Sequence, residues 1–354
     1  MTAPDLRIPA DYPHRAEVAE FFAERAKSVD RVETDVRPGL RFLGERGLLG
    51  LGAPDDADEL TTMLLLVEDV AACCMSSGFS LWAQRMAVEF LSRAPESAEV
   101  APQLAALRRG DRIGVTAMAP ALRYVAGIEP VPVLAERVRG GFRLDGPIPW
   151  ASNLFEDAVV VVPARTADGE CLAAAISLDD AGVSVRNGPR LLALGGTGSS
   201  SVSLEGVHVP DSAVLTRDLS GFVRTVRPTF LLVQTAFCAG LAGASRRQAA
   251  DRISGLNEQF EPDFDDVAAR HDSVRERLFG YGREPHAPSA AELLRLRLDA
   301  AQLAGDATRL ESAVTGGGGY VAASGTSRRL REGAFLPVQA PTEGQLRWEL
   351  SRSA

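Results

Sequence analysis

The sequence predicts an α+β protein with helices at both ends of the chain and a β domain between them. Apolar residues recur at helical spacing up to about residue 107, and short β-prone runs separated by Gly, Pro and Asp follow from residue 114. Helical spacing returns from about residue 227. The chain has 354 residues, enough for two or three packed modules. We therefore expect an N-terminal helical domain at 1–113, a β domain at 114–216 and a C-terminal helical domain at 217–354.

The N-terminal region is typical of a series of amphipathic helices. Val18, Phe22 and Ala26 fall on one face of the first helix, and Leu40 and Leu43 fall on one face of the second. Further helices are expected near residues 60–75, 79–93 and 101–108.

The central region predicts a β barrel or sandwich. Turn signals such as Arg139-Gly-Gly141 and Asp145-Gly146 separate its β-prone runs. The expected strands lie within residues 131–139, 141–144, 158–163, 171–177, 183–185 and 200–209.

The C-terminal region is helical again. The nearly all-apolar stretch from Phe230 to Leu241 must lie in an interior or in a subunit interface. Helices are expected at 263–279, 289–313 and 324–332, with a loop at 280–288 between the first two of these.

Composition excludes several classes of function. A net charge of -9 argues against a nucleic-acid partner, because binding to phosphates depends on clustered Lys and Arg. The start of the chain shows no export signal, and no apolar run is long enough to cross a bilayer, so we expect a soluble, cytoplasmic protein without membrane insertion. The four cysteines and four histidines lack the spacing of a metal site, and we expect no metal.

Four strings in the β region are the most informative part of the sequence. They are Gly141-Phe-Arg-Leu-Asp-Gly146, Trp150-Ala-Ser-Asn153, Gly196-Thr-Gly-Ser-Ser-Ser201 and Val207-His-Val-Pro210. Gly47-Leu-Leu-Gly50 lies upstream, and Gly316-Gly-Gly-Gly-Tyr320 and Arg328-Arg-Leu-Arg-Glu332 lie downstream. In this order the strings resemble those of the acyl-CoA dehydrogenase family over almost the whole chain. The resemblance implies a C-terminal four-helix bundle and FAD bound between this bundle and the β domain.

The resemblance implies that Trp150 and Ser152 contact the flavin. A flat indole can cover an apolar ring face, and a hydroxyl can bond the polar edge of the ring. Taken without the resemblance, the favoured interpretation of Trp150 is a core aromatic at a strand end. Met118 and Ala119 lie where the family has a strand reading Leu-Thr-Glu-Pro, so their main chain is expected to meet the flavin, although only Pro120 of that motif is retained.

Gly316 and Gly317 match the family's glycine pair near the cofactor diphosphate. An alternative is that these glycines serve a loop that needs positive φ or close helix packing. Ala313 stands where the family has a Gln that helps hold the diphosphate, and residues 251–260 do not reproduce its Arg-x-x-Phe-Gly segment.

The resemblance also implies a carboxylate base, since α,β-dehydrogenation removes an α-proton while a hydride passes to FAD. Glu343 is the candidate, in the Glu-Gly string that lies downstream of Arg328-Arg-Leu-Arg-Glu332. Ungapped counting instead places Ala340 in the catalytic position, and Glu343 then becomes a solvated residue at the start of a helix. Arg328 and Arg331 are candidates for binding a substrate phosphate, with structural ion pairs as the alternative.

Three functions remain open at this stage. The first is a flavoprotein oxidoreductase that dehydrogenates an acyl-CoA or carrier-bound acyl thioester with FAD, as a homodimer or homotetramer. The second is a monooxygenase on the same fold that uses reduced flavin supplied by a separate reductase. The third is a flavin-free, non-catalytic homologue that acts as a partner subunit. The sequence does not predict the acyl group or the electron acceptor.

Overall fold

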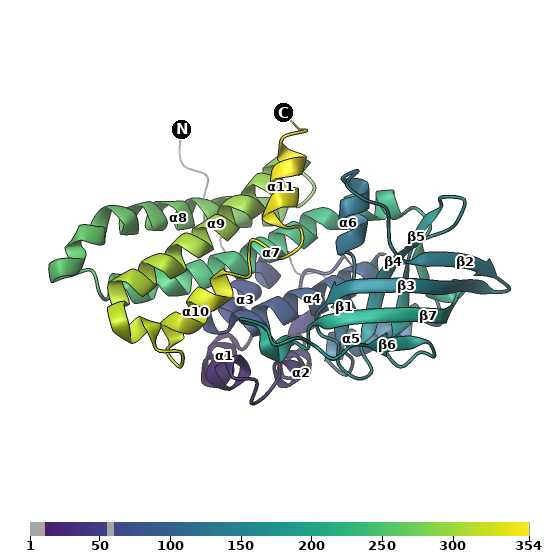
Figure 1. Ribbon diagram of the computed structural model, residues 1–354, viewed down its shortest axis with the longest axis horizontal. Coiled ribbons are helices and arrows are strands. Elements are labelled where there is room, and N and C mark those ends of the chain that lie inside the picture. The colour runs from purple at the N-terminus through teal and green to yellow at the C-terminus, as the bar shows by residue number, and fades with distance from the viewer. Residues whose placement is uncertain (1–10, 55–59, 354) are drawn as a thin grey trace.

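The computed structural model describes residues 11–54 and 60–353, in which helices from both ends of the chain pack together and one sheet lies at the end of the molecule (Figure 1). The N-terminal helices are α1 (Arg15–Asp30), α2 (Arg37–Glu45), α3 (Leu60–Cys73), α4 (Met75–Ser92) and α5 (Val100–Arg109), with a 3-10 turn η1 (Leu48–Gly50) after α2. The helical spacing of the sequence is thereby confirmed for this region. α4 is the most deeply buried of these helices, because its polar residues Gln84, Arg85 and Glu89 find partners inside the protein.

The strands form one eight-stranded sheet. They are β1 (Gly114–Thr116), β2 (Leu134–Val138), β3 (Gly141–Ala151), β4 (Val159–Arg165), β5 (Cys171–Ser177), β6 (Val183–Val185), β7 (Ser200–Pro210) and β8 (Val214–Thr216). The order is β6-β7-β3-β2-β4-β5-β8, with β1 paired to β4. The six strands expected from the sequence are confirmed, whereas β1, β8 and the short helix α6 (Ala119–Val125) were not expected.

The C-terminal helices are α7 (Leu219–Ala250), α8 (Glu261–Arg283), α9 (Ala290–Thr315), α10 (Gly325–Gly333) and α11 (Glu343–Leu350), with 3-10 segments η4 (Gly255–Phe260) and η5 (Gly316–Tyr320). α7 runs along the molecule and packs against both α3 and α9 (Figure 1). Among the described residues, α7 alone is long and apolar enough to cross a membrane by composition, but its most apolar window is entirely buried inside the protein.

The predicted loop at 280–288 is wrong at its start, since α8 continues to Arg283. Gly282 lies against α3, where an added Cβ would stand 2.7 Å from Cδ1 of Leu64 and 3.1 Å from Cγ2 of Thr61. The glycine therefore serves close helix packing here, rather than ending the helix.

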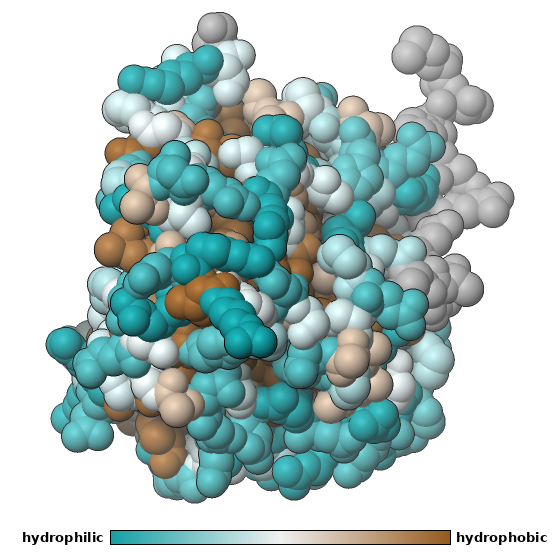
Figure 2. Space-filling model, turned by 90° about the vertical axis from the view of Figure 1, so that its right-hand side faces the viewer, coloured by the Kyte–Doolittle hydropathy of each residue, from teal (hydrophilic) through white to brown (hydrophobic). Residues whose placement is uncertain are grey.

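Figure 2 shows the end of the molecule that carries the sheet. Hydrophilic residues cover most of this face, and hydrophobic residues show in smaller patches between them.

Candidate functional site

A cavity of about 670 Å³ lies where the two helical regions meet the sheet. Its wall combines residues of α4, the β1–α6 corner, the end of β3, the segment 191–199, α7 and the segment 331–342. Volumes of this size are typical of pockets for small molecules and cofactors. The site is therefore assembled from segments far apart in the sequence.

The end of β3 presents Trp150 and Ser152 to this cavity. The β3–β7 pairing shifts register between Ile148 and Ala151, and such an irregularity re-aims the side chains next to it. Trp150 remains 60% exposed, whereas the Ser152 hydroxyl lies 2.6 Å from Oγ of Ser199, another residue of the cavity wall.

Asn153 fixes the loop that follows. It is fully buried, has a φ of 65°, and donates through Nδ2 to the carbonyls of Ser80 and Gly114, both at 3.1 Å. Asn is one of the few residues that adopt this left-handed conformation readily. The loop is thus anchored on its inner side, while Trp150 and Ser152 face the cavity.

Aromatic side chains form the opposite wall. Phe79 stacks on Trp82 at 5.2 Å between ring centroids, and Phe230 and Phe335 meet these two rings edge to face at 5.0 Å. Nε1 of Trp82 is buried and has no hydrogen-bond partner within the described chain. A flat, largely apolar ligand with a polar edge suits this wall, and its acceptor would satisfy the indole N–H.

At the β1–α6 corner, Ala119 lines the cavity. Met118 is not among the lining residues: it is 2% exposed and caps the start of α6. Thr116 also lines the cavity, so a hydroxyl is available here two residues before the predicted pair.

Gly316 and Gly317 lie outside the cavity wall, at the start of η5. Both are exposed, and a Cβ added to either would meet nothing within 4 Å. Gly316 has a φ of 65°, which matches the alternative of a turn that needs positive φ.

The two predicted substrate-binding arginines lie in different surroundings. Arg328 is buried, donates to the carbonyl of Cys73 at 2.9 Å, and does not line the cavity. Arg331 does line the cavity, but its guanidinium is held by Asp30 at 2.7 Å and by the carbonyl of Leu192 at 3.2 Å. This hydrogen-bonded Asp30 raises the pKa of Arg331. Arg331 therefore links α10 to α1 and to the cavity rim.

The structure places Ala340, and not Glu343, in the cavity wall. The Glu343 carboxylate accepts hydrogen bonds from Arg347 at 2.6 Å and from Gln302 at 3.2 Å. The hydrogen bonds from Arg347 are the main cause of a lowered pKa of Glu343. Thr342 lines the cavity and caps α11, so Glu343 lies one residue beyond the wall.

Several lining residues were missed in the sequence: Thr116, Ser199, Trp82 and Gln339. Ser199 belongs to the string Gly196-Thr-Gly-Ser-Ser-Ser201, and Thr116 lies two residues before Met118, so a nearby hydroxyl was the available signal for both. Trp82 and Gln339 gave no local signal, because only the packing of α4 and of the segment before α11 brings them to the site.

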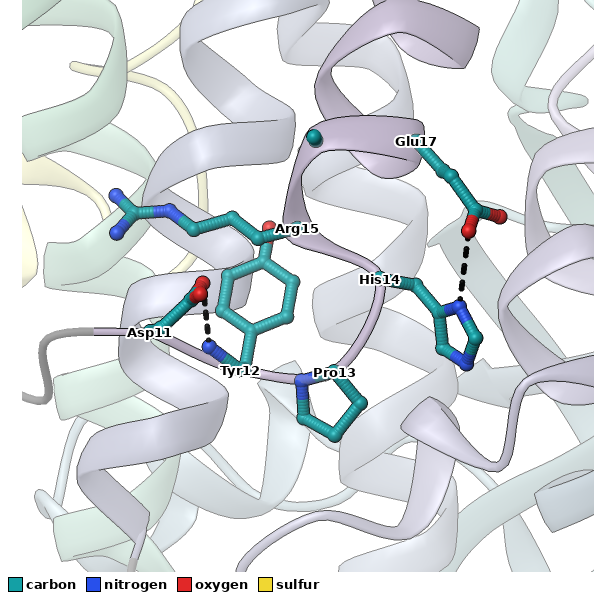
Figure 3. A pocket seen from close by; sticks show the side chains of 7 residues that line it. Asp11, Tyr12, Pro13, His14, Arg15 and Glu17 are labelled. Atoms are coloured by element: carbon teal, nitrogen blue, oxygen red, sulfur yellow. Dashed lines mark hydrogen bonds and ion pairs between the residues drawn. The ribbon is translucent and has the colours of Figure 1, made fainter.

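A second hollow lies at the start of α1 and is lined by residues 11–17 alone (Figure 3). The charged groups here already have partners: His14 contacts Glu17 at 3.1 Å, and Arg15 pairs with Asp69 at 2.7 Å. It lacks convergent groups from other elements. Across the described residues, no cluster of His, Cys, Asp and Glu could hold a metal ion.

No family model matches the chain. The probable acyl-CoA dehydrogenase YngJ of Bacillus subtilis (strain 168) is 23% identical over 357 residues, which cover 93% of each chain.

Solved structures resemble the chain over nearly its full length. The glutaryl-CoA complex of glutaryl-coenzyme A dehydrogenase has a TM-score of 0.86 at 15% identity, and covers 99% of this chain and 95% of its own. A glutaryl-CoA dehydrogenase of Mycobacterium smegmatis in complex with FADH2 has a TM-score of 0.80 at 15% identity, with 97% and 95% covered. The resemblance stated from the sequence motifs is thus confirmed, and the chain has the acyl-CoA dehydrogenase fold.

Proposed function

We propose that this protein is a flavin-dependent oxidoreductase that acts on an acyl thioester, with FAD as its cofactor. The observation that carries the proposal is the cavity itself, which faces Trp150 and Ser152 on one side and the aromatic wall of Phe79, Trp82 and Phe230 on the other. The M. smegmatis relative of the same fold is described with FADH2.

The residues present fit a flavin ring. Trp150 offers an exposed indole face, and Ser152, Ser199 and Thr116 offer hydroxyl groups at the rim. The buried N–H of Trp82 lacks an acceptor among the described residues. When bound, the flavin would accept or donate electrons, while the protein orients it and excludes water from the apolar wall.

Dehydrogenation additionally needs a base next to the acyl α-carbon. Glu343 remains our candidate, and for that role its carboxylate must release Arg347 and Gln302 and turn toward the cavity that Thr342 already lines. In the position that the structure shows, the bonds from Arg347 lower the pKa of Glu343, and releasing them removes this stabilisation of the ionised form, as suits a proton acceptor.

A second function on the same fold is favoured by the composition of the wall. Glu129 is the one acidic side chain among the described lining residues, and it pairs with Nε of Arg123 at 2.5 Å. α7, which contributes Phe230 to the wall, contains no Asp or Glu along its 32 residues and so offers no carboxylate base from this side. Oxygen activation by reduced flavin needs no carboxylate at the position of Ala340, so a reduced-flavin-dependent monooxygenase is the alternative.

The test combines a spectrum with one variant. The purified protein, saturated with FAD, is mixed anaerobically with acyl thioesters of increasing length, and flavin bleaching is followed. Bleaching that is lost in Glu343→Gln supports dehydrogenation with Glu343 as base. Absence of bleaching together with oxygen uptake that depends on added reduced flavin supports the monooxygenase. Absence of flavin affinity would contradict both and leave the flavin-free partner subunit.

We also propose how the protein assembles and where in the cell it is found. Tyr320 and Leu256 are 87% and 88% exposed, and Asn257 of η4 donates to the carbonyl of Val314 near the start of η5. This bond ties η4 to the end of α9, just before η5, and large apolar side chains exposed on neighbouring elements are typical of an interface between subunits. We expect a homodimer or homotetramer in the cytoplasm, and size-exclusion chromatography with light scattering measures the assembly.

A further inference from the structure

Arg297 of α9 is a fully buried cation in the wall behind the cavity. Its side chain has no exposed surface. Nε donates to Oε1 of Gln234 at 3.0 Å, and Nη2 donates to Oε1 of Gln339 at 2.7 Å. Nη1 is buried without a hydrogen-bond partner in the described chain.

The other buried arginines of the described residues have carboxylate partners. Arg85 pairs with Glu89 at 2.9 Å, and Arg328 lies 3.9 Å from Glu332. Among the described residues, Arg297 is paired with the two neutral amides and no carboxylate, with the Phe237 ring centroid 5.8 Å away. The buried Cys238 thiol also lies near this guanidinium, but burial raises its pKa and so keeps it neutral. A guanidinium stays charged in proteins, and an unpaired buried charge is unfavourable. The protein alone thus leaves this charge uncompensated.

The cavity begins directly beside this cation. Gln339 and Ala340 line the cavity, and Gln339 is the side chain that contacts the guanidinium from that side. Gln339 also donates to the carbonyl of Ala340 at 2.6 Å, as does Gln234 at 2.9 Å. Arg297 is therefore one side chain behind the wall, and the small Ala340 leaves room for a ligand at that point.

We propose that Arg297 is the counter-charge for an ionised carboxylate on the ligand, so that the preferred substrates are acyl thioesters with a second, terminal carboxylate. The ligand carboxylate displaces the Gln339 side chain, accepts from Nη2 and satisfies Nη1. This substrate class rests on the proposed function, whereas the anion site itself follows from the unpaired guanidinium. Bidentate bonds between guanidinium and carboxylate are strong and geometrically selective.

The anion site is tested without thioesters, by thermal unfolding of the FAD-saturated protein. The probes are the dicarboxylates from malonate to adipate, each compared with its uncharged diamide. At least one dicarboxylate is expected to raise the Tm while its diamide does not. The rise in Tm is expected to disappear in Arg297→Met, which removes the cation. It should also disappear in Gln339→Glu, because the new carboxylate pairs with Arg297 in place of the ligand. Replacing a buried ion with an apolar residue often preserves folding, so Arg297→Met is expected to fold. If it does not, Gln339→Glu tests the anion site by itself.

The control is Arg331→Met. It removes a cation of the cavity wall whose charge is already paired with the carboxylate of Asp30. We expect the dicarboxylate effect to persist in this variant. An effect that is absent throughout the series, or that disappears in Arg331→Met but persists in Arg297→Met, would overturn the assignment.

Matched thioesters then test the substrate class: succinyl-CoA with butyryl-CoA, glutaryl-CoA with pentanoyl-CoA, and adipoyl-CoA with hexanoyl-CoA. For the best-fitting pair, Arg297→Met is expected to weaken binding of the acidic member by about thirtyfold or more, and that of the neutral member much less. Equal effects on both members would contradict the preference. If dicarboxylates bind but no thioester does, the anion site stands and the proposed function fails. If acidic and neutral thioesters bind alike and dicarboxylates do not bind, the proposed function stands and the anion site fails.

Discussion

The side-chain amide of Gln234 donates a hydrogen bond of 2.9 Å to the backbone carbonyl of Ala340. This bond ties the segment before α11 to the middle of α7, next to Phe230 of the aromatic wall. The carboxylate of Glu343 meanwhile contacts Arg347 and Gln302. The position that ungapped counting assigns to the base therefore presents a methyl group to the cavity, held in place by α7.

In a Glu343→Gln background, which lacks our candidate base, a carboxylate supplied at position 340 is expected to create one. Ala340→Glu should raise the rate of flavin reduction by an acyl thioester at least about a hundredfold over Ala340→Gln, because a positioned general base contributes at least that much. Stopped-flow absorbance of the FAD-saturated variants measures the rate. Equal rates in the two variants would show that the acyl α-carbon does not lie next to residue 340 when the thioester is bound.

Removal of the exposed indole is expected to weaken flavin binding. Trp150→Ala should raise the Kd for FAD about tenfold, since an aromatic face contributes dispersion and stacking energy, whereas Trp150→Phe should change it far less. Flavin fluorescence titration measures both. An unchanged Kd in Trp150→Ala would place the flavin away from the end of β3.

The sequence predicted Trp150 and Ser152 because both belong to one short string that keeps its spacing. It could not predict Trp82, which reaches the cavity only through the packing of α4 against α7. Nor could it predict that Met118 points inward, since this depends on where α6 begins.

The same contrast holds for the fold. Long amphipathic helices and strands leave a periodic pattern, which is why α3 and β7 were placed within two residues of their observed bounds. β1 and β8 have three residues each, too few for an alternation to show. Gly280 and Gly282 wrongly indicated a loop. Gly282 is needed for the contact of α8 with Leu64 of α3, and a contact between elements so far apart in the chain leaves no local pattern.

Those two glycines of α8 give a matched pair for stability. Gly282→Ala is expected to lower the free energy of unfolding by about 1–3 kcal/mol, because its Cβ would overlap Leu64. Gly280→Ala meets nothing within 4 Å and is expected to raise it by about 0.5–1 kcal/mol, as in other helix interiors. Urea unfolding measures both changes, and a stabilising Gly282→Ala would show that α3 and α8 are less closely packed than described.

The buried carboxyl of Glu332 predicts a pH dependence of stability. Burial raises its pKa to about 7, with Arg328 opposing the shift. The folded state therefore holds a proton that the unfolded state releases from about pH 4.5 upward, so stability falls as pH rises toward 7. The loss is on the order of 3 kcal/mol at 1.36 kcal/mol per pKa unit.

Glu332→Gln is expected to remove this part of the pH dependence, which urea unfolding between pH 5 and 8 would show as a difference from the unchanged protein. Glu24→Gln, at an exposed position of α1, serves as the control and should leave the profile as it is. Parallel profiles for the unchanged protein and Glu332→Gln would contradict the raised pKa.

The central claim is that the cavity between the end of β3 and the aromatic wall binds a flavin. Titration of the cofactor-free protein with FAD, followed by visible absorption and fluorescence, tests it most directly. We predict saturable binding at micromolar or lower Kd, with a perturbed flavin spectrum and a weaker Kd in Trp150→Ala. A spectrum that stays that of free FAD at every concentration would contradict the account.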